Sequence, residues 1–187
     1  MNTITLLKVL FTPAAGWPDI VKVRSSTIKI LLMLVLPSML LPPIMLQHAG
    51  EHYPSLIPAL VGKSGALYTP FLFFLEAITF VVVIYQIKNI SNTYGVNIGY
   101  YEAFMLASVS IIPFCISFLT LSVAGIGFGL IPVLIFGALC YSGFIFYKGF
   151  CTYSASQEAL YSVHIVYTVV SAAGSWVVLL AILIALN

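Results

Sequence analysis

Residues 68–87 read YTPFLFFLEAITFVVVIYQI, a run in which Glu76 is the only charged side chain. A helix needs about 20 apolar residues to cross the hydrocarbon core of a bilayer, so this run is long enough to span one. Four further runs of similar length are Ile28–Gln47, Ala103–Leu121, Phe128–Tyr147 and Tyr161–Leu186. The sequence therefore predicts an all-α, polytopic membrane bundle of five transmembrane helices within residues 28–187, preceded by an interfacial amphipathic segment at residues 1–27.

The composition agrees with lipid as the main solvent of this chain. Of its 187 residues, 61% are hydrophobic and only 6% are charged, whereas soluble domains carry about 25% charged residues. A net charge of +2 is too small to indicate nucleic-acid binding. Cys115, Cys140 and Cys151 lack CxxC or similar spacing, so we expect unreactive thiols with no disulfide, metal or redox role.

The basic residues gather on one side of the predicted spans. Lys8, Lys22, Arg24 and Lys29 precede or open the first span, Lys88 ends the second, and Lys148 ends the fourth. Only Lys63 lies on the other side. Because short loops rich in Lys and Arg stay in the cytoplasm, we predict an inner-membrane protein with a cytoplasmic N-terminus. Five spans then place the C-terminus on the periplasmic or outer side.

The segment before the first span alternates apolar and charged residues in two stretches, Ile4–Phe11 and Gly16–Val23. We interpret them as two short helices on the cytoplasmic leaflet, the second beginning at Pro18, because proline suits the first turn of a helix. Trp17 is expected at the membrane–water interface, where tryptophan is enriched.

Prolines and small residues shape the predicted spans. The prolines are Pro37, Pro42, Pro43, Pro113 and Pro132. Each removes a backbone donor and bends its helix, so we expect the freed carbonyls to find partners inside the bundle. The pairs Ala138-xxx-Ser142 and Ser171-xxx-Ser175 allow close helix approach, either within one chain or in a homodimer.

Polar side chains recur at spacings of three and four within three spans, so in each span they share one helical face. They are Thr69, Glu76, Thr79 and Gln86 in the second span, Ser110, Ser117 and Thr120 beside Pro113 in the third, and Tyr161, His164, Thr168, Ser171 and Ser175 in the fifth. Unpaired polar atoms are costly in hydrocarbon. We therefore expect these three faces to turn toward one another and form a polar interior.

Glu76 is the most informative member of these faces. It lies eight residues from the outer end of its span, about 12 Å at helical rise. A lone carboxylate at that depth costs roughly 2.5–3.5 kcal/mol. It is either a proton- or cation-binding group, or a neutral acid bonded to a facing Ser, Thr or Tyr that fixes helix register. His164, near Glu158 and Tyr161, is expected close to the cytoplasmic face, as an interfacial histidine or as part of a polar lid.

His48–His52 reads HAGEH, the H-x-x-E-H order of one class of zinc protease. Such a site needs a helix and a third ligand. We expect Gly50 and Pro54 to keep this stretch in an outer loop of about 20 residues. The prediction is therefore no catalytic metal and no cofactor, with weak metal binding as the alternative.

Residues 10–20 (LFTPAAGWPDI) place a proline and an aromatic residue ahead of an amphipathic stretch. Residues 107–113 (ASVSIIP) form a small-residue run with a proline, and residues 141–149 (YSGFIFYKG) form a Tyr- and Gly-containing helix end. With five spans and the predicted orientation, these features resemble the Yip (Ypt/Rab-interacting protein) domain family of integral membrane proteins. The chain lacks the long hydrophilic N-terminal region of eukaryotic members, so the resemblance implies a bacterial inner-membrane protein and gives no catalytic residues.

Two functions are consistent with this sequence. The first is a non-enzymatic membrane protein that organises the bilayer, a membrane-protein partner or a second copy of itself, through its bundle and basic N-terminal segment. The alternative is a small proton- or cation-linked transporter or channel with Glu76 in its interior. A hydrated cavity at Glu76 favours transport, and a dry, close-packed interior argues against it. An enzyme is not predicted, because the chain has no Walker loop, GxSxG or dinucleotide motif.

Overall fold

The computed structural model describes residues 3–23, 25–55, 65–93 and 95–154, and among these residues there are helices and turns but no strand. Four helical stretches are long and apolar enough to cross a membrane. They are Thr27–His52, Tyr68–Thr93, Tyr100–Val123 and Ile131–Tyr153. The all-α prediction is thus confirmed for the described part of the chain. The fifth predicted span, Tyr161–Leu186, lies outside it.

Two short helices come first in the chain, α1 (Thr3–Phe11) and α2 (Pro13–Lys22). The first span consists of α3 (Thr27–Ile30), a π-helical turn (Leu31–Val35) and α4 (Leu36–His52), and α5 (Gly65–Thr93) is the second. The third consists of α6 (Tyr100–Ser110), α7 (Ile112–Ser117) and a 3-10 segment (Phe118–Val123). A turn made of α8 (Ala124–Gly127) and a 3-10 segment (Phe128–Leu130) leads to the last described helix, α9 (Ile131–Ser154).

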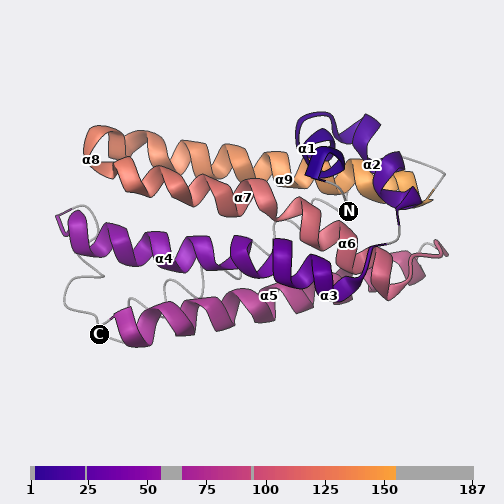
Figure 1. Ribbon diagram of the computed structural model, residues 1–187, viewed down its shortest axis with the longest axis horizontal. Coiled ribbons are helices and arrows are strands. Elements are labelled where there is room, and N and C mark those ends of the chain that lie inside the picture. Colours follow the sequence, from indigo (N-terminus) through magenta and orange to yellow (C-terminus); the bar gives the residue numbers. More distant parts are fainter. Residues whose placement is uncertain (1–2, 24, 56–64, 94, 155–187) are drawn as a thin grey trace.

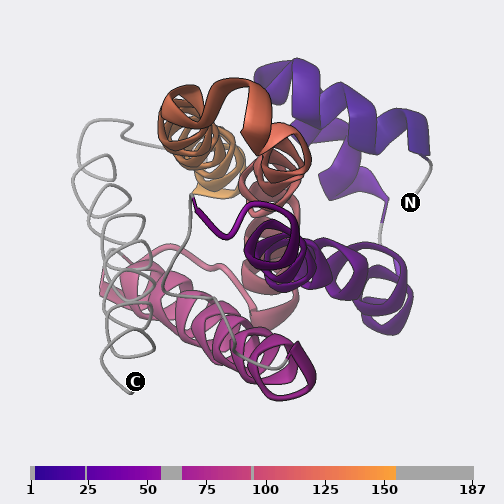
Figure 2. The same cartoon turned by 90° about the vertical axis from the view of Figure 1, so that its left-hand side faces the viewer.

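The spans run along the long axis of the molecule (Figure 1). Viewed along that axis, they form a bundle rather than a single row (Figure 2). Helices α1 and α2 lie at the end where α3 begins and where α5 and α9 finish (Figure 1). This is the end that carries Lys8, Lys22, Lys29, Lys88 and Lys148. Helix α7 packs antiparallel against α9 across the short connection (Figure 1).

The third span is the centre of the described bundle. In its most apolar stretch 61% of the residues are buried, against 22% for each of the spans formed by α5 and α9. Those two outer helices leave large apolar side chains exposed, among them Phe74 at 67% and Phe136 at 66%. Such a surface suits lipid, whereas a helix that is apolar all round and surrounded by protein suits the core.

Two predicted helix ends and one predicted kink differ from the structure. Helix α5 continues to Thr93 and α9 to Ser154, well beyond the apolar runs, because a helix satisfies its own backbone hydrogen bonds and does not require apolar side chains at its ends. Cys151, which follows the fourth apolar run in the sequence, is therefore helical. Pro132 does not interrupt its span, because it is the second residue of α9, where its missing N–H has no helical acceptor.

Candidate functional site

Glu76 lies in the middle of the buried face of α5. At spacings of three or four residues, this face also carries Leu72, Phe80, Ile87 and Ile90. Glu76 is 1% exposed, so its carboxyl stands where the helix otherwise presents apolar side chains to the core. The site is thus a single acid inside an apolar contact surface.

Neither carboxylate oxygen of Glu76 has a hydrogen-bond partner among the described residues. The Cys115 thiol of α7 is close enough for the two groups to interact electrostatically. A facing Ser, Thr or Tyr partner was expected for a register-fixing acid, and the described part of the chain does not supply one. Leu72 and Phe80, one turn away on either side along α5, and Cys115 are also buried, so solvent does not reach this part of the helix. A carboxyl in such a place is stable only as the neutral acid or with a bound cation.

Three hydroxyls of the predicted polar faces donate to backbone carbonyls of their own helices. Thr79 donates to the Leu75 carbonyl at 3.0 Å, Ser117 to that of Phe114 at 2.6 Å, and Thr120 to that of Ser117 at 2.7 Å. Back-bonding of this kind satisfies a hydroxyl in hydrocarbon without a second helix, so these three hydroxyls need no partner from another span. That the three faces turn toward one another stays a prediction, because the face of the fifth span lies outside the described residues.

The other polar residues of the predicted faces have different surroundings. Ser110 is buried and its Oγ has no partner among the described residues, while Gln86 is half-buried on α5. Thr69 makes a contact between spans, donating to Oε1 of Gln47 on α4 at 2.5 Å. The fifth-span candidates, His164, Thr168, Ser171 and Ser175, lie outside the described residues, as do Glu158 and Tyr161.

Pro113 breaks the central span into α6 and α7, with Ile111 between them. Proline has no N–H, so the Val109 carbonyl receives no helical hydrogen bond from it. The next amide, that of Phe114, donates to the Ser142 hydroxyl of α9 at 3.2 Å. The Ala138-xxx-Ser142 pair therefore serves packing within the chain. Sequence alone did not reveal this bond, because nothing local links Ser142 to the proline.

Trp17, which we expected at the membrane–water interface, packs inside the protein. Its side chain is fully buried, and its indole Nε1 donates to the Ile145 carbonyl of α9 at 2.9 Å. Gly149, one turn further along α9, makes room for the ring, since a Cβ there would lie 2.5 Å from Trp17 Cε2. Burial of the ring with a satisfied N–H outweighs the interfacial preference of tryptophan.

Two tyrosines fasten the rest of the N-terminal region to the bundle. Tyr141 of α9 donates to the Leu10 carbonyl at 2.6 Å, and Tyr101 of α6 donates to the Ser25 carbonyl at 2.9 Å. Helices α1 and α2 also cross very closely, because a Cβ on Gly16 would lie 2.5 Å from the Val9 backbone nitrogen. The two helices therefore form one unit, the N-terminal helix pair (residues 3–22), which is docked on α9.

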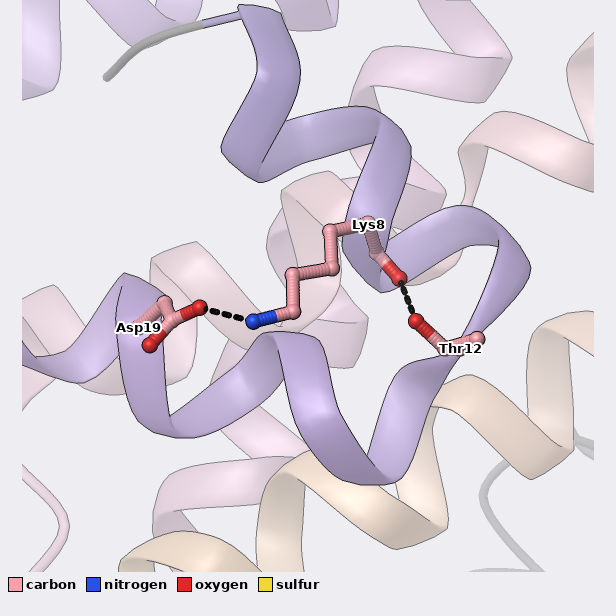
Figure 3. A network of polar contacts seen from close by, with 3 residues as sticks. All are labelled: Lys8, Thr12 and Asp19. Atoms are coloured by element: carbon pink, nitrogen blue, oxygen red, sulfur yellow. Dashed lines mark hydrogen bonds and ion pairs between the residues drawn. The ribbon is translucent and has the colours of Figure 1, made fainter.

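The second helix of this pair begins at Pro13 and not at Pro18, which lies inside it. Thr12 joins the two helices, since its hydroxyl and its amide both donate to the Lys8 carbonyl at 2.8 Å (Figure 3). The Lys8 ammonium meets the Asp19 carboxylate at 2.5 Å across the pair (Figure 3). This hydrogen bond, together with the charge of Lys8, holds the pKa of Asp19 below its ordinary value.

The outward side of the N-terminal helix pair is apolar and basic. Its large exposed apolar side chains are Leu7, Phe11 and Val21, with exposed Val23 directly after the pair, and its exposed lysines are Lys8 and Lys22. Phe11 is 77% exposed, an unusual position for a phenylalanine. Because Trp17 and the tyrosines fix the inward side, this surface has a defined orientation at the basic end of the bundle.

The HAGEH stretch is helical, contrary to the expectation of a loop. Helix α4 continues through Gly50 to His52, and it ends at Tyr53, the residue before Pro54. A proline disfavours helical backbone at the residue before it, whereas a single glycine only weakens a helix. No cluster of three His, Cys, Asp or Glu side chains suited to a metal ion occurs in the described ranges.

Comparison of the chain with protein-family models, curated proteins and solved structures found no match.

Proposed function

We propose that this chain is an inner-membrane protein of the Yip type that organises the bilayer or a partner protein and catalyses no reaction. In this proposal five spans cross the membrane, the N-terminus is cytoplasmic, and the N-terminal helix pair presents the functional surface. The proposal draws on the charge pattern, on the apolar surface of the spans and on the sequence resemblance.

The observation that carries this proposal is the docking of the N-terminal helix pair through Trp17. A segment that only anchored the protein would place its tryptophan in the lipid headgroups. Here the indole is used to fix the pair on α9, while Leu7, Phe11, Val21 and Val23 stay exposed. A rigidly held surface of apolar and basic residues is suited to bind a partner at low entropic cost.

Photo-crosslinking in cells tests this proposal. A photoreactive amino acid at Phe11 should capture a discrete protein partner, and the Trp17→Ala change should weaken that capture. The same amino acid at Phe136, which is similarly exposed at 66% on the lipid-facing side of α9, is the matched control. A crosslinking pattern at Phe11 that is identical to the one at Phe136 contradicts a protein partner at this surface.

A second candidate function, proton- or cation-linked transport, is favoured by one observation, the buried carboxyl of Glu76, which has no hydrogen-bond partner within residues 3–23, 25–55, 65–93 and 95–154. Ionisable groups inside membranes commonly mark ion paths. Glu76 is only 1% exposed, which argues against a permanently open path, so transport would need a second conformation that admits water or an ion. This candidate ranks below the first for that reason.

Reconstituted vesicles separate the two candidates. Transport predicts a proton or cation flux above that of empty vesicles, and Glu76→Gln should abolish it while Trp17→Ala leaves it intact. Wild-type flux equal to that of empty vesicles, under both proton and sodium gradients, contradicts the transport candidate.

A further inference from the structure

The last turn of α4 carries two histidines on one face. His48 and His52 are four residues apart, so their side chains project from the same side of the helix. The rings are stacked, with centroids 4.1 Å apart and an interplanar angle of 27°. His48 is half-buried and His52 is exposed, so solvent reaches the pair. It lies at the opposite end of the bundle from α1 and α2 (Figure 1).

The hydrogen bond of His52 fixes which of its ring nitrogens is free. Its Nδ1 lies 3.0 Å from the backbone carbonyl oxygen of His48. A carbonyl oxygen can only accept, so Nδ1 carries the hydrogen. In the neutral ring the Nε2 atom then keeps its lone pair. Such a bond to the non-ligating nitrogen is the arrangement that orients histidine ligands in metal sites.

Neighbouring groups hold this turn in place. The Tyr53 ring packs edge-on against His48, with centroids 6.4 Å apart, and its hydroxyl donates to the Ser122 carbonyl at 2.9 Å. On the same turn, Gln47 donates to the Glu51 carboxylate at 2.8 Å. The histidines therefore sit on a helix end braced against the third span, beside a fixed negative charge that favours a bound cation.

We infer that this turn binds one transition-metal ion, Zn²⁺, Cu²⁺ or Ni²⁺, through the Nε2 atoms of His48 and His52. Imidazole nitrogen suits these metals, with metal–nitrogen distances of about 2.0–2.1 Å for zinc. To share one ion the two rings must rotate out of their stacked arrangement so that both Nε2 lone pairs point at it, and water fills its remaining positions. The helical i, i+4 spacing is the one by which the two histidines of an H-E-x-x-H helix share a zinc ion. This site is independent of the function proposed for the N-terminal helix pair.

Metal titration of the purified protein tests this inference. The protein is prepared in detergent with an affinity tag that contains no histidine, and Cu²⁺ binding is followed by electron paramagnetic resonance. Zn²⁺ is then competed against a chromogenic chelator. We expect one ion per chain, with nitrogen hyperfine coupling in the copper spectrum. His48→Ala or His52→Ala should each weaken binding about tenfold or more, because the second imidazole binds intramolecularly.

His164→Ala is the matched control, since it removes the chain's remaining histidine and should leave metal affinity unchanged. Both altered side chains of the turn are accessible to solvent, and circular dichroism checks that the variants remain folded. The inference is overturned if a folded His48→Ala/His52→Ala double variant binds the metals as tightly as the wild type. An equal loss of affinity in His164→Ala overturns it as well.

Discussion

Trp17 is the side chain that fixes the N-terminal helix pair on the bundle. Truncation of a buried tryptophan removes its packing and one hydrogen bond, at a cost of about 3–5 kcal/mol. We therefore expect Trp17→Ala to undock residues 3–22, seen as loss of hydrogen-exchange protection there while α6 stays protected. Gly149→Ala should do the same, because its Cβ occupies the place of the ring. Unchanged protection in both variants would show that the docking does not depend on the indole.

We expect Glu76 to lower the stability of the folded protein. Its oxygens have no partner among the described residues, so removing the carboxyl sacrifices no hydrogen bond there. Burying a polar group without a hydrogen bond costs free energy, and an apolar side chain of similar size avoids that cost. Glu76→Leu should unfold in detergent at a temperature equal to or above that of the wild type, and Glu76→Gln should fold. A marked drop in the melting temperature of Glu76→Leu would instead identify Glu76 as a structural lock.

At the level of elements, the break between α6 and α7 is coupled to α9 through Ser142. Ser142→Ala leaves the Phe114 N–H without its acceptor, and a buried unsatisfied donor costs about 1–3 kcal/mol. In a Pro113→Ala background the helix can close and the amide can return to the Ser110 carbonyl. We therefore predict that Ser142→Ala costs less in that background, measured by a double-mutant cycle of unfolding free energies. Equal costs in both backgrounds contradict the coupling.

The ion pair between α1 and α2 gives the N-terminal helix pair a dependence on pH. The Lys8 contact lowers the pKa of Asp19 in the folded protein, from an unfolded value of about 3.9. The ion pair therefore stabilises the folded state fully when the pH is above the unfolded pKa of Asp19. This stabilisation disappears as the pH falls through the lower pKa of Asp19 in the folded protein. Hydrogen exchange of residues 3–22 should show this acid loss in the wild type and not in Asp19→Asn. Because the pair is solvent-exposed, the effect should be far smaller than that of Trp17→Ala.

For the whole molecule, hydrophobic run length predicted the described spans, since it reflects a solvent constraint that acts on every residue of a span. The contacts that position the N-terminal helix pair could not be predicted in this way. Trp17 and its acceptor Ile145 are 128 residues apart, and the local preference of tryptophan favours an interface. The bonds of Thr79, Ser117 and Thr120 to their own helices could not be predicted either, because polar periodicity does not show whether a hydroxyl bonds within its helix or to a neighbouring one. We also expected Gly50 to interrupt the helix, but α4 continues to His52 and ends just before Pro54.

The number and orientation of the spans are tested most directly by paired reporter fusions. Alkaline phosphatase is active only after export, and green fluorescent protein fluoresces only in the cytoplasm. After Ser154, at the basic end of the bundle, we predict a fluorescent and phosphatase-inactive fusion. After Asn187, beyond the fifth predicted span, we predict the opposite pattern, with active phosphatase and no fluorescence. A fluorescent fusion at Asn187 would contradict a five-span protein with a cytoplasmic N-terminus.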